Sequence, residues 1–230
     1  MSSTKGNLKV IYEDNHLIVV NKRSGDIVQG DRTGDKPLNE VVKDYIKVKY
    51  NKPGDVYLGT VHRLDRPTSG IVIFARTSKA LTRMNKLFAD KNIQKTYWAV
   101  TEKAPAQKIG FLNDWLQKNE KQNKSYVMKK GQGKEAELNY KVLGHSDKYH
   151  LVEVQPKTGR HHQIRVQLSS IGAIIKGDLK YGAKRSNKDG SIHLLARKIE
   201  FIHPVKQEPI SITAEPPEDP VWDFFAKKFQ

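Results

Sequence analysis

The chain of 230 residues contains no cysteine. Disulfide bonds, thiolate nucleophiles and zinc sites built on cysteine are therefore excluded. Long apolar runs are also missing, since no strongly apolar segment approaches the roughly 20 residues that span a bilayer. The first seven residues lack the apolar stretch of a secretory leader. We therefore expect a cytoplasmic protein that does not enter a membrane.

Acidic residues are few relative to basic ones. Aspartate and glutamate total 25 against 41 lysines and arginines, which gives a net charge of +16 and an isoelectric point near 9.8. Such a surplus attracts polyanions, so nucleic acid is the expected partner and a membrane surface is the rival. The mean hydropathy of -0.67 is polar, but the apolar residues cluster in short runs, which is compatible with a packed core.

Motifs for metals and nucleotide phosphates are also absent. The adjacent His161 and His162 do not have the i, i+4 spacing of a helical zinc pair. Residues 131–134, Gly-Gln-Gly-Lys, lack both the preceding strand and the Gly-Lys-Ser/Thr ending of a phosphate loop. We therefore expect neither a metal nor a cofactor.

Strand-like segments outnumber helical ones and often follow one another directly. Alternating or apolar runs predict strands at residues 8–12, 17–21, 71–75, 95–100, 136–143, 149–154, 192–202 and 210–214. This order favours an α+β fold with a mostly antiparallel mixed sheet and flanking helices over repeated βαβ units. We found no internal repeat and no linker, so residues 1–230 are expected to form a single domain.

Helical periodicity is confined to a few segments. It predicts helices at residues 37–46 and 78–88, with Ser78 as the N-cap of the second. It also predicts a turn that becomes a helix within residues 159–170, and a short helix at 221–225. Residues 103–134 are rich in Lys, Gln, Asn and Gly, and they are expected to form turns and an exposed hairpin.

The most informative segment is residues 61–70, which read Val-His-Arg-Leu-Asp-Arg-Pro-Thr-Ser-Gly. Asp65 lies between two arginines, whose positive charge favours the ionised carboxylate. A turn and a buried strand follow, and such a rigid element suits a nucleophile or a base. The alternative is a surface aspartate that pairs with Arg63 or Arg66, an arrangement that is common and contributes little.

A second cluster, residues 157–165, reads Lys-Thr-Gly-Arg-His-His-Gln-Ile-Arg and opens a predicted helix. Its guanidinium and imidazole groups could bind phosphates or pair with a carboxylate. The alternative is a solvated helix start, but cations there oppose the helix dipole, which favours a functional role.

The third cluster is the strand at residues 95–99, Lys-Thr-Tyr-Trp-Ala. Lys95, Tyr97 and Ala99 share one face because side chains alternate along a strand. Tyr97 could stack on a base or act as an acid or base. Taken alone, a strand tyrosine is more often half-buried packing.

Together these segments resemble the RluA family of pseudouridine synthases. The matches are His-Arg-Leu-Asp at 62–65 with Thr-Ser-Gly at 68–70, Lys-x-Tyr-x-Ala at 95–99, and Thr-Gly-Arg-x-His-Gln-Ile-Arg at 158–165. Gly-Asp at 177–178 and Tyr-Gly at 181–182 also match, as do the opening strands. The resemblance extends from about residue 8 to 217. The sequence departs from the family pattern at Arg23, at Ala173-Ile174 and at Leu195.

The resemblance implies a fold, an activity and a set of site residues. Asp65 falls on the catalytic aspartate, Tyr97 on the active-site tyrosine and Arg165 on the arginine that pairs with the aspartate. RNA-binding roles are implied for Arg63, Lys95, Arg160 and His162. The reaction would isomerise a uridine in structured RNA, either transfer or ribosomal RNA, without a cofactor or a metal. The resemblance also implies a monomer without an obligate protein partner and without a separate S4-type RNA-binding domain.

Two other functions are compatible with part of this pattern. A non-catalytic RNA-binding or RNA-chaperone domain on the same fold explains the charge, but it does not explain the joint presence of Asp65, Tyr97 and Arg165. A nuclease or glycosidase would commonly need a pair of carboxylates, and only one candidate is evident.

Overall fold

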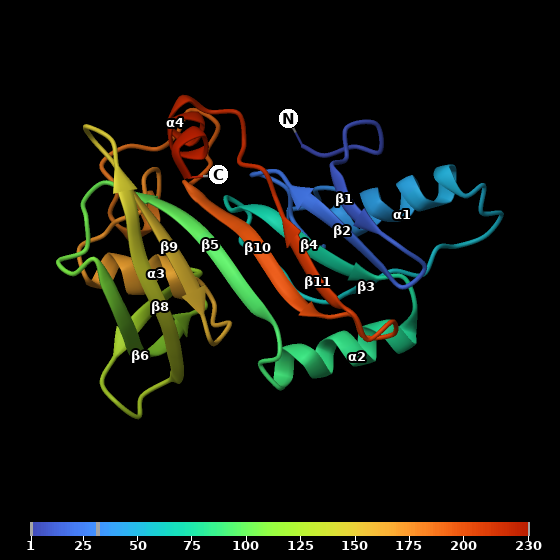
Figure 1. Cartoon of the computed structure of the whole chain (residues 1–230), viewed down its shortest axis with the longest axis horizontal. Helices are drawn as coiled ribbons and strands as arrows, with labels where there is room; N and C mark the ends of the chain where they lie inside the picture. The colour runs from blue at the N-terminus through green and yellow to red at the C-terminus, as the bar shows by residue number, and fades with distance from the viewer. Residues whose placement is uncertain (1, 31–32, 230) are drawn as a thin grey trace. The chain divides into compact units, whose positions relative to one another are not determined.

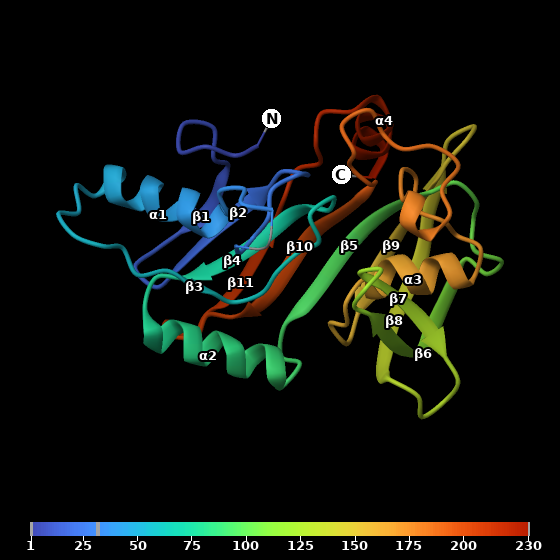
Figure 2. The same ribbon diagram turned by 180° about the vertical axis from the view of Figure 1, so that it is seen from behind.

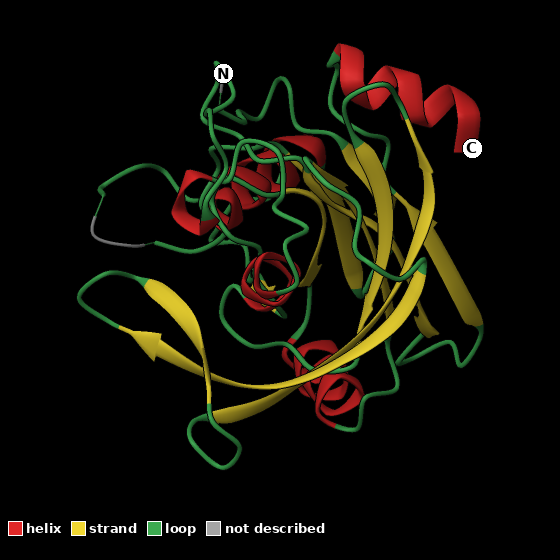
Figure 3. Ribbon diagram, turned by 90° about the vertical axis from the view of Figure 1, so that its left-hand side faces the viewer, coloured by secondary structure: helices red, strands yellow, loops and turns green. Residues whose placement is uncertain are grey.

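A computed structural model describes residues 2–30 and 33–229. The chain divides into two compact units. The first contains Met1–Ile93 and Ala196–Pro217, and the second contains Gln94–Leu195 and Glu218–Gln230. Strands are the main regular structure and the helices are short separate elements (Figure 3). The α+β prediction is confirmed. In the described ranges, no helix has both the length and the apolar character needed to cross a bilayer.

The first unit is built on a mixed, mostly antiparallel sheet. Its strands, in spatial order, are β1 (Val10–Glu13), β2 (Leu17–Lys22), β4 (Ser69–Ala75) and β10 (Leu194–Ile202), with β3 (Gly59–Thr60) on β4 and β11 (Pro209–Thr213) on β10. The pairs β1–β2, β2–β4 and β10–β11 are antiparallel (Figure 1). Every residue of β4 is buried, so its short apolar run is a core strand, as its composition predicts.

Two helices belong to the first unit, α1 (Leu38–Lys49) and α2 (Ser78–Ala89). The apolar side of α1 buries Leu38 and Ile46 in a cluster that also contains Phe74 of β4. The predicted cap of α2 is wrong by one residue. Thr77 is the N-cap, and its side-chain oxygen accepts a hydrogen bond from the backbone amide of Ala80 at 3.1 Å. Thr77 has the extended backbone that a cap requires, whereas Ser78 is already helical.

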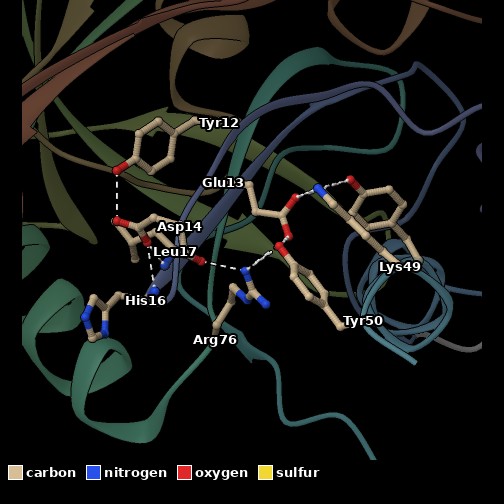
Figure 4. A network of polar contacts seen from close by, with 9 residues as sticks. Tyr12, Glu13, Asp14, His16, Leu17, Lys49, Tyr50 and Arg76 are labelled. Atoms are coloured by element: carbon tan, nitrogen blue, oxygen red, sulfur yellow. Dashed lines mark hydrogen bonds and ion pairs between the residues drawn. The ribbon is translucent and has the colours of Figure 1, made fainter. Parts of the chain in front are cut away.

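A polar network closes the turn between β1 and β2 (Figure 4). Asp14 accepts hydrogen bonds from the backbone amides of His16 and Leu17, both at 2.8 Å, and from the Tyr12 hydroxyl at 2.9 Å. Burial alone would raise the pKa of Asp14. The hydrogen bonds outweigh burial and lower the pKa to about 2.

Glu13 extends the same network to the end of α1. Its carboxylate accepts from Lys49 at 2.6 Å and from the Tyr50 hydroxyl at 2.9 Å, and it pairs with Arg76 at 3.1 Å. Arg76 also donates to the backbone oxygen of Asp14 at 2.6 Å. These contacts connect β1, the end of β4 and the end of α1.

The low pKa of Asp14 makes stability depend on pH. A carboxyl with a lowered folded-state pKa contributes stability above its unfolded pKa and loses it as the pH falls through the folded value. At pH 6, we expect Asp14→Asn to lower the free energy of unfolding by on the order of 2 kcal/mol. This difference should shrink as the pH falls from about 4 to about 2. Urea unfolding at several pH values measures it. Asp44→Asn, on an exposed side of α1, should change stability by less than about 0.5 kcal/mol.

The second unit contains its own antiparallel series. Its strands, in spatial order, are β5 (Gln94–Thr101), β9 (His150–Pro156), β8 (Lys134–His145), β6 (Ile109–Asn119) and β7 (Lys124–Met128). The hairpin expected within residues 103–134 is present as β6 and β7, but β6 is a regular strand of 11 residues. The polar composition hides the strand because only its inward side is packed, around Leu116.

Helices cover the two faces of this sheet unequally. The helix α3 (Gln163–Ser170) packs through Ile164 and Leu168 on one face and lies in front of β8 and β9 in Figure 2. The C-terminal α4 (Pro220–Phe229) buries Trp222 and Phe225 with Trp98 on the other face. A short 3₁₀ helix, η1 (Leu179–Tyr181), follows α3.

Candidate active site

Asp65 lies in the first unit, on the loop between β3 and β4. It is half-buried. Its backbone oxygen accepts from the amide of Thr68 at 3.0 Å, which closes a tight turn. The strand that follows is fully buried. The loop is therefore fixed at its C-terminal end, as a reacting carboxylate requires.

The segment after β2 holds this loop from the other side. The Lys22 ammonium donates to the backbone oxygens of Arg66 at 3.1 Å and Thr68 at 2.7 Å. The Ser24 hydroxyl donates to the oxygen of Pro67 at 3.1 Å, and the Gly25 amide donates to the oxygen of Arg66 at 2.9 Å. All three carbonyl groups that follow Asp65 before β4 are thereby fixed.

Lys22 is a buried cation with 1% of its surface exposed. Burial lowers its pKa to about 7, and the nearby charges of Asp26 and Asp65 partly oppose that shift. Its third donation, to the backbone oxygen of Arg23 at 2.9 Å, completes the donor capacity of an ammonium. Lys22 thus holds the loop, and its protonated form places a positive charge near Asp65.

Removing the Lys22 ammonium is expected to loosen the Asp65 loop. Lys22→Met keeps most of the apolar stem but removes the ammonium donor of Thr68, whereas the Arg66 oxygen keeps the Gly25 amide. A buried carbonyl oxygen that loses its donor costs about 1–3 kcal/mol. We expect a loss of about 2 kcal/mol in the free energy of unfolding. Chemical unfolding measures this effect. Lys9→Met, at an exposed site, is the control, and equal results for the two variants would contradict the role.

The other charged and aromatic residues of the loop have separate roles. Arg63 is exposed. Arg66 pairs with Asp35 at 2.7 Å, at a solvent-exposed position. His62 accepts a hydrogen bond from the backbone amide of Ile73 at 3.1 Å and so attaches the loop to β4. Arg63 therefore presents a cation to solvent next to the Asp65 turn.

Arg165 lies in the second unit, on the first turn of α3, with 5% of its side chain exposed. Its Nε and Nη2 donate to the two carboxylate oxygens of Asp178 at 2.7 Å and 2.9 Å. Its guanidinium also lies 5.1 Å from the centre of the Tyr181 ring. This bidentate pair fixes the plane of the guanidinium.

His162 lies beside this pair and is buried. Its Nδ1 is 2.9 Å from the Tyr181 hydroxyl. Burial, helped by the positive charge of Arg165, lowers the pKa of His162 to about 2, so the ring is neutral at physiological pH. Its backbone is left-handed with φ of 54°, which is uncommon outside glycine. A contact of His162 with RNA would therefore involve a neutral imidazole.

Tyr181 connects α3 to the β6–β7 hairpin. Its hydroxyl accepts from the Ser125 amide at 2.9 Å. The Ser125 hydroxyl donates to the backbone oxygen of His161 at 2.7 Å, and the rings of His161 and His162 stack 3.7 Å apart. The hairpin and the start of α3 are thus one polar assembly.

The remaining predicted residues lie on β5 and before α3. Tyr97 is half-buried and packs against the cluster that contains Ile164, on the α3 face. Lys95 is also half-buried, and burial lowers its pKa. Trp98 packs on the other face with α4, which confirms the predicted alternation. Arg160 is exposed and donates from Nε to the backbone oxygen of Glu135 at 2.8 Å.

The predicted residues fall in both units. Asp65 and Arg63 are in the first unit, and the others are in the second. The sequence signals named neither the anchoring role of Lys22 nor Asp178 as a carboxylate partner of Arg165, although both positions lie in the matched motifs. Among residues 2–30 and 33–229, no group of three or more histidine or acidic side chains could hold a metal ion.

The fold and the motif residues define an antiparallel α+β protein that resembles RNA-modifying isomerases. The family of RNA pseudouridylate synthases matches residues 16–170. The chain belongs to this family, and its RluA-type resemblance is confirmed. Enzymes of this family are isomerases that convert uridine to pseudouridine in RNA.

Curated relatives agree with this assignment. The chain is 31% identical over 222 residues to ribosomal large subunit pseudouridine synthase D of Zymomonas mobilis, covering 92% of this chain and 70% of the relative. It is 35% identical over 211 residues to ribosomal large subunit pseudouridine synthase C of Vibrio vulnificus, covering 89% and 64%. It is 30% identical to tRNA pseudouridine synthase C of Pectobacterium carotovorum, covering 90% and 58%. The chain spans about two thirds of the length of such relatives.

Solved structures support the fold. Human RNA Pseudouridylate Synthase Domain Containing 4 superposes with a TM-score of 0.77 at 23% identity, covering 96% of this chain and 93% of that one. Human RNA Pseudouridylate Synthase Domain Containing 1 gives a TM-score of 0.73 at 22% identity, covering 97% and 89%. At these identities the likeness establishes the fold alone.

Proposed function

We propose that this chain isomerises specific uridines in ribosomal or transfer RNA to pseudouridine, with Asp65 as the essential catalytic group. The observation that carries the proposal is the Asp65 loop, whose following carbonyls are all held by the segment from Lys22 to Gly25. A carboxylate on a loop fixed in this way is prepared for chemistry at a sugar carbon.

The proposed reaction breaks the C1′–N1 bond of the target uridine, turns the uracil and forms a C5–C1′ bond. The C5 proton is lost and N1 gains a proton, so the product is an isomer of the substrate. Asp65 acts either as a nucleophile or as a base at the sugar. The sequence motifs support both roles equally. The proposed reaction needs no cofactor or metal.

The other site residues receive proposed roles around Asp65. Arg165 takes the role that the family resemblance implies, as the arginine that serves the catalytic aspartate, in addition to its contact with Asp178. Tyr97 stacks on the uracil and helps to remove the C5 proton. Arg63 fills the space that the flipped nucleotide leaves in the RNA stack. Lys95, Arg160 and His162 contact the RNA, His162 as a neutral ring.

The substrate is proposed to be a structured RNA. The net charge of +16 attracts the phosphate backbone independently of sequence. RNA shape and splayed loop bases then supply specificity. We propose a cytoplasmic monomer in which residues 1–230 act as one catalytic domain without an obligate protein partner.

Pseudouridine mapping tests the proposal. Total RNA from cells with and without the gene is treated with carbodiimide and mapped by reverse-transcription stops, with an Asp65→Ala complement. A stop that disappears in the deletion, returns with the wild type and stays absent with Asp65→Ala supports the activity and identifies the target. Identical maps in all strains would favour the non-catalytic RNA-binding domain.

A further inference from the structure

One face of the sheet in the second unit is only partly covered. The helix α4 packs on this face around Trp98. Among the described residues of this unit, no other helix covers the part of the face formed by β6, β8 and the end of β9 (Figure 1). Two apolar side chains of β6 are exposed there, Ile109 at 67% and Phe111 at 49%. Large apolar side chains that remain on a sheet face commonly mark an interaction surface.

Amide side chains lie in register with Phe111. Phe111 pairs with Asn139 of β8, and Asn139 pairs with Gln155 of β9. Adjacent strands are about 5 Å apart, so the ring and two amides form one row across three strands. Asn113, two residues after Phe111, belongs to the same face. We call the set Ile109, Phe111, Asn113, Asn139, Gln155 and Lys157 the Phe111 face.

Cations lie over both exposed rings of this side of the sheet. The Lys157 ammonium is 4.9 Å from the centre of the Phe111 ring. Tyr126 of β7, which is 38% exposed, pairs with Gln117 of β6. Lys124 lies at the edge of the sheet, 5.3 Å from the ring centre of Tyr126 and 5.2 Å from that of Tyr181. Both rings therefore combine a stacking surface with a positive charge.

The carboxylates near these rings hydrogen-bond to, or lie opposite, other side chains of the sheet. Glu135 accepts a hydrogen bond from Asn113 at 3.1 Å, and Glu153 lies opposite Lys141 in the register of β8 and β9. Glu137 pairs with Asn113 in the sheet. The face is therefore mixed in charge, and stacking, rather than a dense field of cations, is the interaction that it favours.

We propose that the Phe111 face binds a single-stranded segment of RNA. One base stacks on Phe111, its edge hydrogen-bonds to the amides of Asn139 and Gln155, and a backbone phosphate lies near Lys157. Sheets that present exposed aromatic residues use this combination to hold unpaired bases. The core of a protein interface would instead be depleted in charge. This inference rests on the proposed RNA substrate and adds a contact outside the reacting residues.

A binding measurement tests the inference directly. The probe is a fluorescein-labelled single-stranded 12-nucleotide RNA of mixed sequence, titrated with the full chain and followed by anisotropy. Phe111→Ala is expected to weaken binding about 10-fold, because one stacked base is lost. Phe111→Tyr should bind like the wild type. Phe224→Ala removes a ring of similar exposure, 45%, from α4 and should have no effect.

Salt dependence separates stacking from charge. Lys157→Ala should reduce the slope of log affinity against log salt by about 0.7, the value for one phosphate on single-stranded nucleic acid. Phe111→Ala should leave that slope unchanged. Circular dichroism of each variant verifies that the fold is retained.

The possible outcomes distinguish this inference from the proposed activity. If Phe111→Ala binds the oligonucleotide like the wild type while Asp65→Ala abolishes isomerisation, the Phe111 face is not an RNA site and the activity stands. If Phe111→Ala loses binding while the wild type forms no pseudouridine, the surface stands and the activity fails. Unchanged RNA binding together with altered sedimentation of Phe111→Ala would indicate that the face contacts a second copy of the chain.

Discussion

Replacement of Asp65 by asparagine is expected to lower the rate of pseudouridine formation by roughly 10⁴-fold or more, as expected for the loss of an essential reacting group. Asparagine has the shape of aspartate, but it can neither attack the sugar as a carboxylate nor accept a proton as a base. The turn should survive, because the contact between Thr68 and residue 65 uses the backbone oxygen. RNA affinity should change by less than about threefold, since one side chain is altered and the cationic surface remains.

Release of tritium from RNA labelled at C5 of uridine measures this rate. Asp35→Asn is the matched control, because Asp35 is exposed and pairs with Arg66, the residue next to Asp65. Its rate should remain within about twofold of the wild type, since an exposed ion pair contributes little. Activity of Asp65→Asn above a few per cent of the wild type would exclude an essential carboxylate at this position.

Gly70→Ala is expected to destabilise the first unit by about 3 kcal/mol or more. Gly70 has a φ of +112°, which L side chains rarely adopt, and a Cβ built on it would lie 2.4 Å from the backbone oxygen of Ala196. The conformational cost is about 1–2 kcal/mol, and forced overlap typically adds 1–3 kcal/mol. Backbone atoms of a neighbouring strand cannot rotate away as a flexible side chain can.

Gly25→Ala is the matched control for this overlap. Gly25 also has a positive φ of +92°, but a Cβ there has nothing within 4 Å. It should therefore bear only the conformational cost of about 1–2 kcal/mol. Urea unfolding of both variants measures the difference. Equal destabilisation would mean that β4 and β10 separate at little cost, contrary to the close approach at Gly70.

Much of the fold follows from local patterns. The buried strand β4 and the alternating faces of β5 are visible in the sequence because each has a simple apolar pattern. The strand β6 is not visible in the sequence, because many of its outward residues are polar. Sequence alone also does not distinguish its exposed Phe111 from a core residue. The predicted N-cap of α2 was wrong by one residue because threonine and serine are both good caps. Only the backbone angles show which of Thr77 and Ser78 precedes the helix.

The sequence predicts which elements carry the candidate site residues, but it does not predict the contacts that support those residues. The motif order singles out Asp65, Tyr97 and Arg165, and the motif pattern places them on a loop, a strand and a helix. The pairing of Arg165 with Asp178 depends on how η1 returns to α3, which no spacing rule specifies. The role of Lys22 is also not predictable from spacing, because its ammonium donates to backbone oxygens more than 40 positions further along the chain.

The first unit is discontinuous in sequence, and this has a consequence for synthesis. On one side β4 is next to β2, and on the other side it is next to β10. Most of β10 belongs to the first unit, although more than 100 residues separate it from β4 in the sequence. While a ribosome makes the intervening residues, β4 is an uncovered sheet edge of apolar side chains, which is prone to pairing with other chains. Nascent chains of this protein should therefore depend on chaperone protection until residues 196–217 emerge.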